Sequence, residues 1–231
     1  LNYTLDTIER NLSEAKLLNR ETIQKKDRWY EIGRRVQDIL FSSLALIVLS
    51  PFMLLVAVII YIDSPGASPI FSQTRVGLMG KEFKFYKFRS MIPNAESKLE
   101  ELLDRNEMEG PAFKIKDDPR ITRVGKILRE LSLDELMQFF NVFKGDMSLV
   151  GPRPERPKFV EKFKEEIPRY MIKHQVRPGI TGWAQVNGRN SITWEEKFLL
   201  DVEYVDNISF AMDFKIFVRT ILNVLKQDGI N

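Results

Sequence analysis

The chain has 231 residues, a formal net charge of +3 and a length suited to one sizeable core. The absence of cysteine excludes disulfides, thiol catalysis and cysteine-ligated metals. The single histidine argues against a histidine-cluster zinc site or a Ser-His-Asp triad, so acid, base and nucleophile roles fall to carboxylates, lysines or tyrosines. The positive charge suits an anionic membrane surface, a phosphorylated substrate or nucleic acid, without choosing among them.

Residues 1–29 are polar, with leucine and isoleucine at helical spacing at positions 1, 5, 8 and 12. A self-associating helix, and hence a homo-oligomer, is one interpretation, and a solvated linker helix is the other. We expect residues 1–29 to be an extension or linker without chemistry, and 30–231 to form the main domain. Because the sequence begins at Leu1, we also expect an upstream part.

Residues 39–62 form a block of 24 residues without a formal charge. As a straight helix it would be roughly 36 Å long, enough to cross a hydrocarbon core of about 30 Å. Ser50-Pro51 lies in the middle of the block, and proline removes a backbone hydrogen bond and clashes with the preceding turn. The sequence therefore predicts a strong kink in a membrane helix.

Both flanks of this block are positive, with basic residues at 20, 25, 26, 28, 34 and 35 and again at 75, 81, 84, 87 and 89. The positive-inside tendency favours both flanks on the cytoplasmic side, which a helix–break–helix that re-enters allows. A single spanning helix is the alternative. The backbone groups freed at the break would need Ser50 or neighbouring protein as partners, because lipid supplies none.

Two short strands are expected at 69–75 and 81–91, with a turn at 77–80. Basic and aromatic residues alternate over 83–88, a pattern that could bind single-stranded nucleic acid or the membrane headgroup region. We favour the membrane and expect no nucleic-acid partner; packing in the core is the simpler interpretation for Phe83 and Phe85.

Three further helices are expected. Residues 94–110 have the composition of a charged surface helix. Residues 158–175 and 208–226 are basic and amphipathic, so their apolar faces could pack on a soluble core or lie in the bilayer interface. The pattern as a whole indicates a mainly α chain with a small β component, an α+β fold.

The stretch 129–156 carries the strongest indication of chemistry. Ser132 and Glu135 have the S-x-x-E spacing of a capping box, which places Asp134 and Glu135 in the first turn of a helix ending near Phe143. The positive end of a helix dipole favours carboxylates and bound phosphates alike. Ordinary capping is the alternative interpretation of this acidic pair.

Two loops follow. In Gly151-Pro152-Arg153-Pro154 an arginine stands between two prolines, which predicts a rigid loop that presents Arg153 to a phosphate or carboxylate. Residues 177–190 contain three glycines and the polar residues Arg177, Asn187 and Arg189, as in a ligand-binding loop or simply a series of turns.

The strings SLDEL, FNVFKGDMSLVGPRPE and RPGITGWAQVNGRN resemble the bacterial monotopic phosphoglycosyl transferases, also called the bacterial sugar transferase family. The resemblance runs from about Tyr30 to Asp228 and leaves residues 1–29 outside. It implies a membrane helix that re-enters at Ser50-Pro51, membrane-surface amphipathic helices, and a compact catalytic domain on the cytoplasmic face of the bacterial inner membrane.

The resemblance also implies a reaction. A sugar 1-phosphate would pass from a UDP-sugar to polyprenyl (undecaprenyl) phosphate with release of UMP, through an aspartyl-phosphosugar on Asp134. Glu135 would be its partner carboxylate, and Mg²⁺ would neutralise the diphosphate with Asp134 as the expected ligand. The expected substrate-binding residues are Arg153, Arg189, Lys87, Arg89, Arg129, Gln138 and Arg177.

A non-catalytic, membrane-anchored module that binds anionic lipids or glycan intermediates is the competing interpretation. It needs the basic surfaces and the anchor but not Asp134. The sequence does not specify the sugar, because no stretch reads a pattern of hydroxyl groups.

Overall fold

A computed structural model describes residues 28–98, 102, 115, 117–167, 170–188 and 192–226. The helix expected within 1–29 lies outside this part, except that Arg28 and Trp29 begin the first described helix. Most of the helix expected at 94–110 is also outside it, and residues 93–98 form turns.

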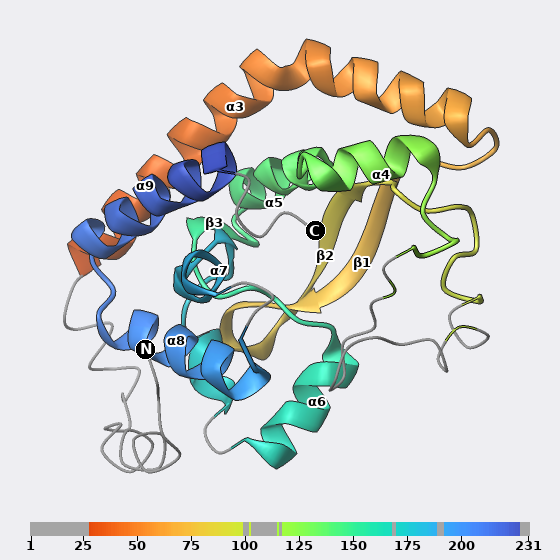
Figure 1. The fold of residues 1–231 in the computed structure, drawn as a ribbon. Coiled ribbons are helices and arrows are strands. Elements are labelled where there is room, and N and C mark those ends of the chain that lie inside the picture. The colour runs from red at the N-terminus through yellow and green to blue at the C-terminus, as the bar shows by residue number, and fades with distance from the viewer. Residues whose placement is uncertain are drawn as a thin grey trace.

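The apolar block belongs to α3, a 36-residue helix from Arg28 to Asp63. It is the one described helix that is long and apolar enough to cross a membrane. The helix continues through Pro51, so the expected helix–break–helix is not seen; instead α3 arches over the rest of the molecule (Figure 1). Ser50 Oγ donates to the Ile47 carbonyl at 2.8 Å. In a regular helix this carbonyl would accept from the backbone N–H of residue 51, which proline lacks. The local hydrogen bond from Ser50 explains why the helix persists through the proline.

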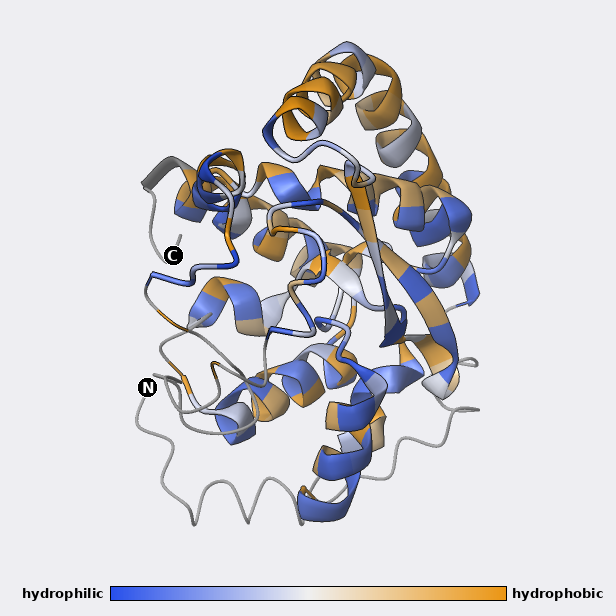
Figure 2. Ribbon diagram, turned by 90° about the vertical axis from the view of Figure 1, so that its right-hand side faces the viewer, coloured by the Kyte–Doolittle hydropathy of each residue, from blue (hydrophilic) through white to orange (hydrophobic). Residues whose placement is uncertain are grey.

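Both halves of α3 contact the same globular body. Near its start, Arg34 and Asp38 hydrogen-bond to residues 148–150. Near its end, Val56 and Ile60 are buried against Phe88 and Leu128. Most of the apolar side chains between these contacts are exposed. In Figure 2 the ribbon of α3 is mostly in the hydrophobic colour.

The two expected strands are present. β1 (Ile70–Val76) and β2 (Glu82–Phe88) form an antiparallel hairpin in the register Ile70↔Phe88 to Val76↔Glu82. The short helix η1 (Leu78–Gly80) forms the turn. A second, parallel pair joins β3 (Ser148–Val150) to β4 (Gly179–Thr181).

Helices make up the rest of the described chain, which confirms the mainly helical composition with a small β component. They are α4 (Arg123–Glu130), η3 (Leu133–Met137), α5 (Gln138–Lys144), α6 (Pro157–Glu166), η4 (Tyr170–Gln175), α7 (Trp183–Asn187), α8 (Trp194–Asp206) and α9 (Phe210–Lys226). The largest buried cluster joins residues of α6, η4, α8 and α9, including Phe163, Tyr170, Phe198 and Ile216.

The two amphipathic regions behave differently. In the first, the expected helix over 158–175 ends at Glu166, and its apolar residues Val160 and Phe163 are buried in the core. In the second, α9 leaves much of its apolar face exposed, at Phe210, Phe214, Phe217, Ile221 and Leu222. Packing on the core therefore accounts for α6 but not for the outer face of α9.

Candidate active site

Asp134 and Glu135 lie in the first turn of η3, which continues directly into α5 and ends at Lys144, close to the predicted end. The predicted capping box is wrong. Ser132 adopts a left-handed conformation with φ of 54° and makes no side-chain cap hydrogen bond. Its backbone carbonyl accepts from the Glu135 amide at 3.2 Å, and its backbone amide donates to the Arg129 carbonyl at 3.1 Å. The Glu135 side chain does not reach back to Ser132 because two cations from other elements hold it.

Lys87 and Arg153 are these cations. Lys87, near the end of β2, places Nζ 2.8 Å from Glu135 Oε1 and 3.3 Å from Asp134 Oδ2. Arg153, in the loop between β3 and α6, places Nη2 2.7 Å from the same Glu135 oxygen. Three segments distant in the sequence thus form one cluster, called here the dyad cluster: Lys87, Asp134, Glu135 and Arg153.

The charges of the dyad cluster strongly favour ionised Glu135. Burial alone would raise the pKa of this carboxyl, but Arg153 and Lys87 outweigh burial and hold its pKa well below the usual range. Asp134 is only 6% exposed. The arrangement therefore presents a mostly buried carboxylate next to cations that could instead bind phosphate oxygens.

Two further predicted residues lie close to the dyad cluster. Arg129 donates through Nε to Ser90 Oγ at 2.9 Å. Partial desolvation lowers the pKa of Arg129, and the Asp134 charge opposes that shift. Gln138 is fully buried one turn after Asp134, and its side-chain amide has no hydrogen-bond partner within the described residues.

Two predicted residues are not brought into the dyad cluster. Arg89 donates to the Ser68 carbonyl at 2.6 Å. Arg177 donates to the Gly145 carbonyl at 3.1 Å, and Gly145 caps the opposite end of α5 from the acidic pair. Arg189 lies outside the described residues.

The loop that carries Arg153 is fixed by a residue that the sequence analysis did not select. Arg75, at the end of β1, donates through Nη1 to the Pro154 carbonyl at 3.0 Å and pairs with Glu155 Oε2 at 3.3 Å. The Val76 amide donates to the Glu155 carbonyl at 2.9 Å. A basic residue at the end of a predicted strand was the only available signal, and nothing local linked it to a loop 79 positions later.

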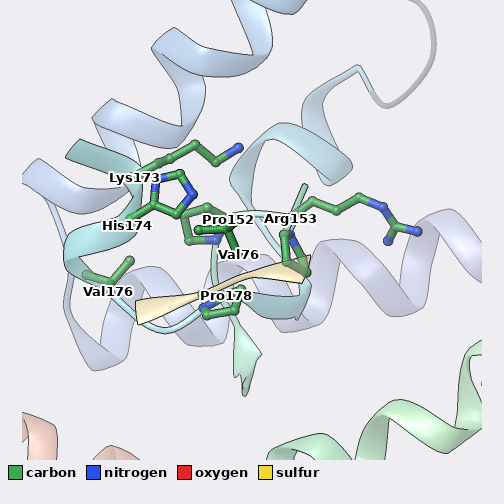
Figure 3. Close-up of a pocket in the computed structure, with 9 residues that line it drawn as sticks. Val76, Pro152, Arg153, Lys173, His174, Val176 and Pro178 are labelled. Carbon is green, nitrogen blue, oxygen red and sulfur yellow. The ribbon is translucent and has the colours of Figure 1, made fainter. Parts of the chain in front are cut away.

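A small cavity lies behind this loop, with Pro152, Lys173, His174 and Pro178 among its lining residues (Figure 3). Its volume of about 10 Å³ is comparable to the space of one water molecule and far too small for a sugar nucleotide. Figure 3 shows the Arg153 side chain extending away from this cavity. The arginine is therefore directed to the dyad cluster and not to the cavity.

The described residues contain no group of three or more His, Cys, Asp or Glu side chains arranged to hold a metal ion. Mg²⁺ commonly uses one or two protein carboxylates and completes its shell with water and substrate phosphates. The neighbouring Asp134 and Glu135 carboxylates fit that type of site, in which the substrate supplies the remaining oxygens.

Comparison with known proteins adds a family match. The family described as "Bacterial sugar transferase" matches residues 29–227. This range includes all of α3 except Arg28, the dyad cluster and the loop of Arg153.

Three curated relatives are similar over most of the chain. The UDP-N-acetylgalactosamine-undecaprenyl-phosphate N-acetylgalactosaminephosphotransferase of Aeromonas hydrophila is 45% identical over 87% of this chain, which spans 45% of that protein. The uncharacterized sugar transferase EpsL of Bacillus subtilis (strain 168) is 47% identical over 71% of this chain and 74% of its own length. The galactosyl transferase CpsE of Streptococcus agalactiae serotype III (strain NEM316) is 43% identical over 86% of this chain and 43% of its own length. The chain thus spans less than half of two of these relatives.

Proposed function

Because the chain belongs to the bacterial sugar transferase family, we propose that it transfers a sugar 1-phosphate from a UDP-sugar to undecaprenyl phosphate. The observation that carries this proposal is the dyad cluster, in which Asp134 lies beside a glutamate held by Lys87 and Arg153. Such a cluster offers a nucleophile and phosphate-binding cations in one place.

The proposed reaction has two displacements at one phosphorus atom. A carboxylate oxygen of Asp134 attacks the phosphorus that carries the sugar, a bond from this phosphorus to Asp134 forms, and the diphosphate P–O bond breaks to release UMP. An oxygen of undecaprenyl phosphate then attacks the same phosphorus. The bond to Asp134 breaks, the carboxylate is regenerated, and the product is undecaprenyl diphosphate carrying the sugar. Covalent catalysis divides one difficult displacement into two easier ones.

The other residues of the dyad cluster bind and orient. Lys87 and Arg153 exchange part of their contact with Glu135 for the phosphate oxygens of the substrate. Glu135 stays ionised and orients both cations toward the phosphate oxygens, and the acceptor phosphate attacks as its dianion. Asp134 would hold Mg²⁺ together with the diphosphate, and the ion would supply neutralising charge. Arg129 and Gln138 complete the surroundings, and Arg89 and Arg177 would contact the substrate only from outside the dyad cluster. Arg189 would also bind the substrate.

The substrate lipid requires a site at the membrane surface, and α3 supports that location. Its two halves contact the same globular body, through Arg34 and Asp38 at one end and Val56 and Ile60 at the other. A helix that crossed the bilayer would separate these ends by about 30 Å of hydrocarbon. We therefore propose that α3 re-enters at Ser50-Pro51 and that the chain is monotopic, on the cytoplasmic face of the bacterial inner membrane. The exposed apolar face of α9 would lie in the bilayer interface.

Cysteine labelling tests the re-entry. The 231 residues contain no cysteine, so each introduced cysteine is unique in them. Trp29→Cys and Pro65→Cys place thiols at exposed positions before and after the apolar part of α3. In inside-out membrane vesicles a membrane-impermeant maleimide should label both variants, and in intact spheroplasts neither. Labelling of the two variants from opposite sides would establish a spanning helix.

The decisive activity test uses the protein in lipid nanodiscs with Mg²⁺, undecaprenyl phosphate and a panel of UDP-sugars. Wild type should release UMP in a lipid-dependent manner, and Asp134→Asn should release none. The panel is needed because the named relatives differ in sugar, N-acetylgalactosamine for one and galactose for another.

Without the lipid acceptor, a radiolabelled sugar should remain attached to wild type and be released by hydroxylamine, as expected of an acyl phosphate. Folded Asp134→Asn should retain no label. Turnover by Asp134→Asn would contradict the role of Asp134 as the nucleophile. Lipid binding without UMP release from any sugar in the panel would favour the non-catalytic module.

A further inference from the structure

The first turns of α3 direct two buried polar side chains at β3. Arg34 Nε donates to Ser148 Oγ at 3.0 Å, and Arg34 Nη2 donates to the Val150 carbonyl. Asp38 Oδ1 accepts from Ser148 Oγ at 3.0 Å and from the Leu149 amide at 2.9 Å. Each of the three β3 residues is therefore bound by α3.

The Ser148–Asp38 hydrogen bond is buried, and the other three contacts are partly buried, so little freedom remains. Asp38 is 3% exposed and Ser148 is 1% exposed. A buried carboxylate is costly unless it is hydrogen-bonded, so a shift of β3 away from Asp38 would leave both Asp38 and the Leu149 amide without their partners. The contacts of Arg34 and Asp38 therefore fix β3 in a single position relative to α3.

The opposite edge of β3 is fixed by β4. Ser148 pairs with Gly179 and Val150 with Thr181, and the Gly151 amide continues the pairing to the Thr181 carbonyl at 2.8 Å. A Cβ at Gly151 would lie 2.4 Å from the Arg177 carbonyl oxygen, so only glycine fits at this point. β3 is thus held between α3 and β4 immediately before the loop begins.

Arg153 follows β3 by three positions, between two prolines whose rings fix backbone φ. A displacement of β3 is consequently carried to Arg153 with little room for correction by the loop. The Arg153 guanidinium must stay within hydrogen-bond distance of Glu135, now 2.7 Å, so a shift of about 1 Å would break the contact.

We propose that Arg34 and Asp38 are positioning residues of the active site, which act through β3 to set Arg153 against Glu135. This inference rests on the proposed function for its kinetic consequence. It means that the membrane helix is part of the catalytic framework, because its first turns hold the segment that delivers the phosphate-binding arginine.

A double-mutant cycle separates positioning from general stabilisation. Asp38→Ala should lower kcat by about 10- to 100-fold, the size expected for a misplaced catalytic contact. In an Arg153→Ala background the same change should lower kcat by less than about 3-fold, because the group that Asp38 positions is gone. Equal fold-losses in both backgrounds would overturn the proposal.

Two matched variants serve as controls. Asp38→Asn keeps an oxygen acceptor for Ser148 and Leu149, so it should recover most of the kcat lost in Asp38→Ala. Arg35→Ala removes a neighbouring α3 arginine that donates instead to the Val142 and Phe143 carbonyls at 2.7 Å each, near the end of α5. Whatever loss Arg35→Ala causes should be the same with and without Arg153.

Amide hydrogen exchange tests the structural claim without turnover. Exchange of residues 148–153 should be at least about 10-fold faster in Asp38→Ala than in wild type, and unchanged in Asp38→Asn and Arg35→Ala. If wild type releases no UMP, the proposed function fails while this measurement still decides the inference. Unchanged exchange in Asp38→Ala would overturn it. If Asp38→Ala does not fold, Arg34→Gln tests the same attachment with the same expected exchange.

Discussion

The dyad cluster and the Lys173–Asp201 pair contain contacts of the same length in different surroundings. Arg153 Nη2 lies 2.7 Å from Glu135 Oε1, and Lys173 Nζ lies 2.7 Å from Asp201 Oδ2. The side chains of Arg153 and Glu135 are 39% and 18% exposed, whereas those of Lys173 and Asp201 are 8% and 4% exposed. Distance alone therefore does not distinguish a working site from a structural ion pair, but accessibility does.

The two carboxylates also differ in how their charge is balanced. Burial raises the pKa of Asp201, and Lys173 opposes that shift. Burial would raise the pKa of Glu135 too, but two cations outweigh it and lower that pKa. The dyad cluster has cations that can turn to a substrate phosphate while Glu135 stays ionised. In the Lys173–Asp201 pair no cation is free to bind a ligand, so we assign this pair a role in folding stability.

Breaking the buried pair should have the largest effect. Lys173→Met leaves Asp201 buried without its cation and should lower the free energy of unfolding by about 3–5 kcal/mol. Lys173→Met/Asp201→Leu should recover most of this loss, because a buried ion pair can often be replaced by apolar groups of similar volume. Thermal and denaturant unfolding in the same detergent measure the stability of the single and the double variant. A loss below about 1 kcal/mol in the single variant would remove the assignment to folding.

Glu135→Gln should affect catalysis more than stability. It removes the charge that orients Lys87 and Arg153, so kcat should fall by about 100-fold. The free energy of unfolding should fall less than in Lys173→Met, because water screens the partly exposed cations. Glu130→Gln makes the same change at an exposed position at the end of α4 and should stay within about 2-fold of wild type. Equal kcat for Glu135→Gln and Glu130→Gln would contradict the role of Glu135.

Local sequence indicated the parts of the dyad cluster but not all of what holds it. Asp134, Glu135 and Arg153 belong to short motifs, and Lys87 to a strand with a recognisable alternation, so each could be selected without a structure. The capping box failed because tertiary ion pairs draw Glu135 to Lys87 and Arg153, 48 and 18 positions away.

The supports were missed for the same physical reason. Arg75 and Asp38 act on segments 79 and 111 positions away, at Pro154 and Leu149, and no local pattern reports such distant hydrogen bonds. The hairpin and the helical character were accessible because periodicity and turn residues encode them locally. The sequence predicted a break at Pro51 because the Ser50 hydroxyl was considered only as a required partner, not as the group that keeps α3 continuous by donating to the Ile47 carbonyl.

The pH dependence of stability should report the dyad cluster separately from the buried pair. The pKa of Glu135 is lowered by folding, so its ionised form contributes stability that is fully present above the unfolded pKa of about 4.3. That contribution is lost as pH falls through the lower folded pKa. The difference in Tm between wild type and Glu135→Gln should therefore be constant from pH 8 to pH 5 and shrink below about pH 4. A difference that shrinks between pH 7 and pH 5 would mean that Lys87 and Arg153 do not hold Glu135 ionised.

The smallest loss of stability is expected for an uncharged hydrogen bond in α3. It can be compared with the losses expected for the two ion-paired regions. Ser50→Ala removes the hydroxyl that donates to the Ile47 carbonyl and should lower the free energy of unfolding by about 1 kcal/mol. Ser43→Ala makes the same change seven positions earlier, at a hydroxyl without a side-chain hydrogen bond in the described part of the chain. Unfolding in nanodiscs should show a larger loss for Ser50→Ala than for Ser43→Ala. Equal losses would mean that the Ile47 carbonyl does not need the Ser50 hydroxyl as its donor.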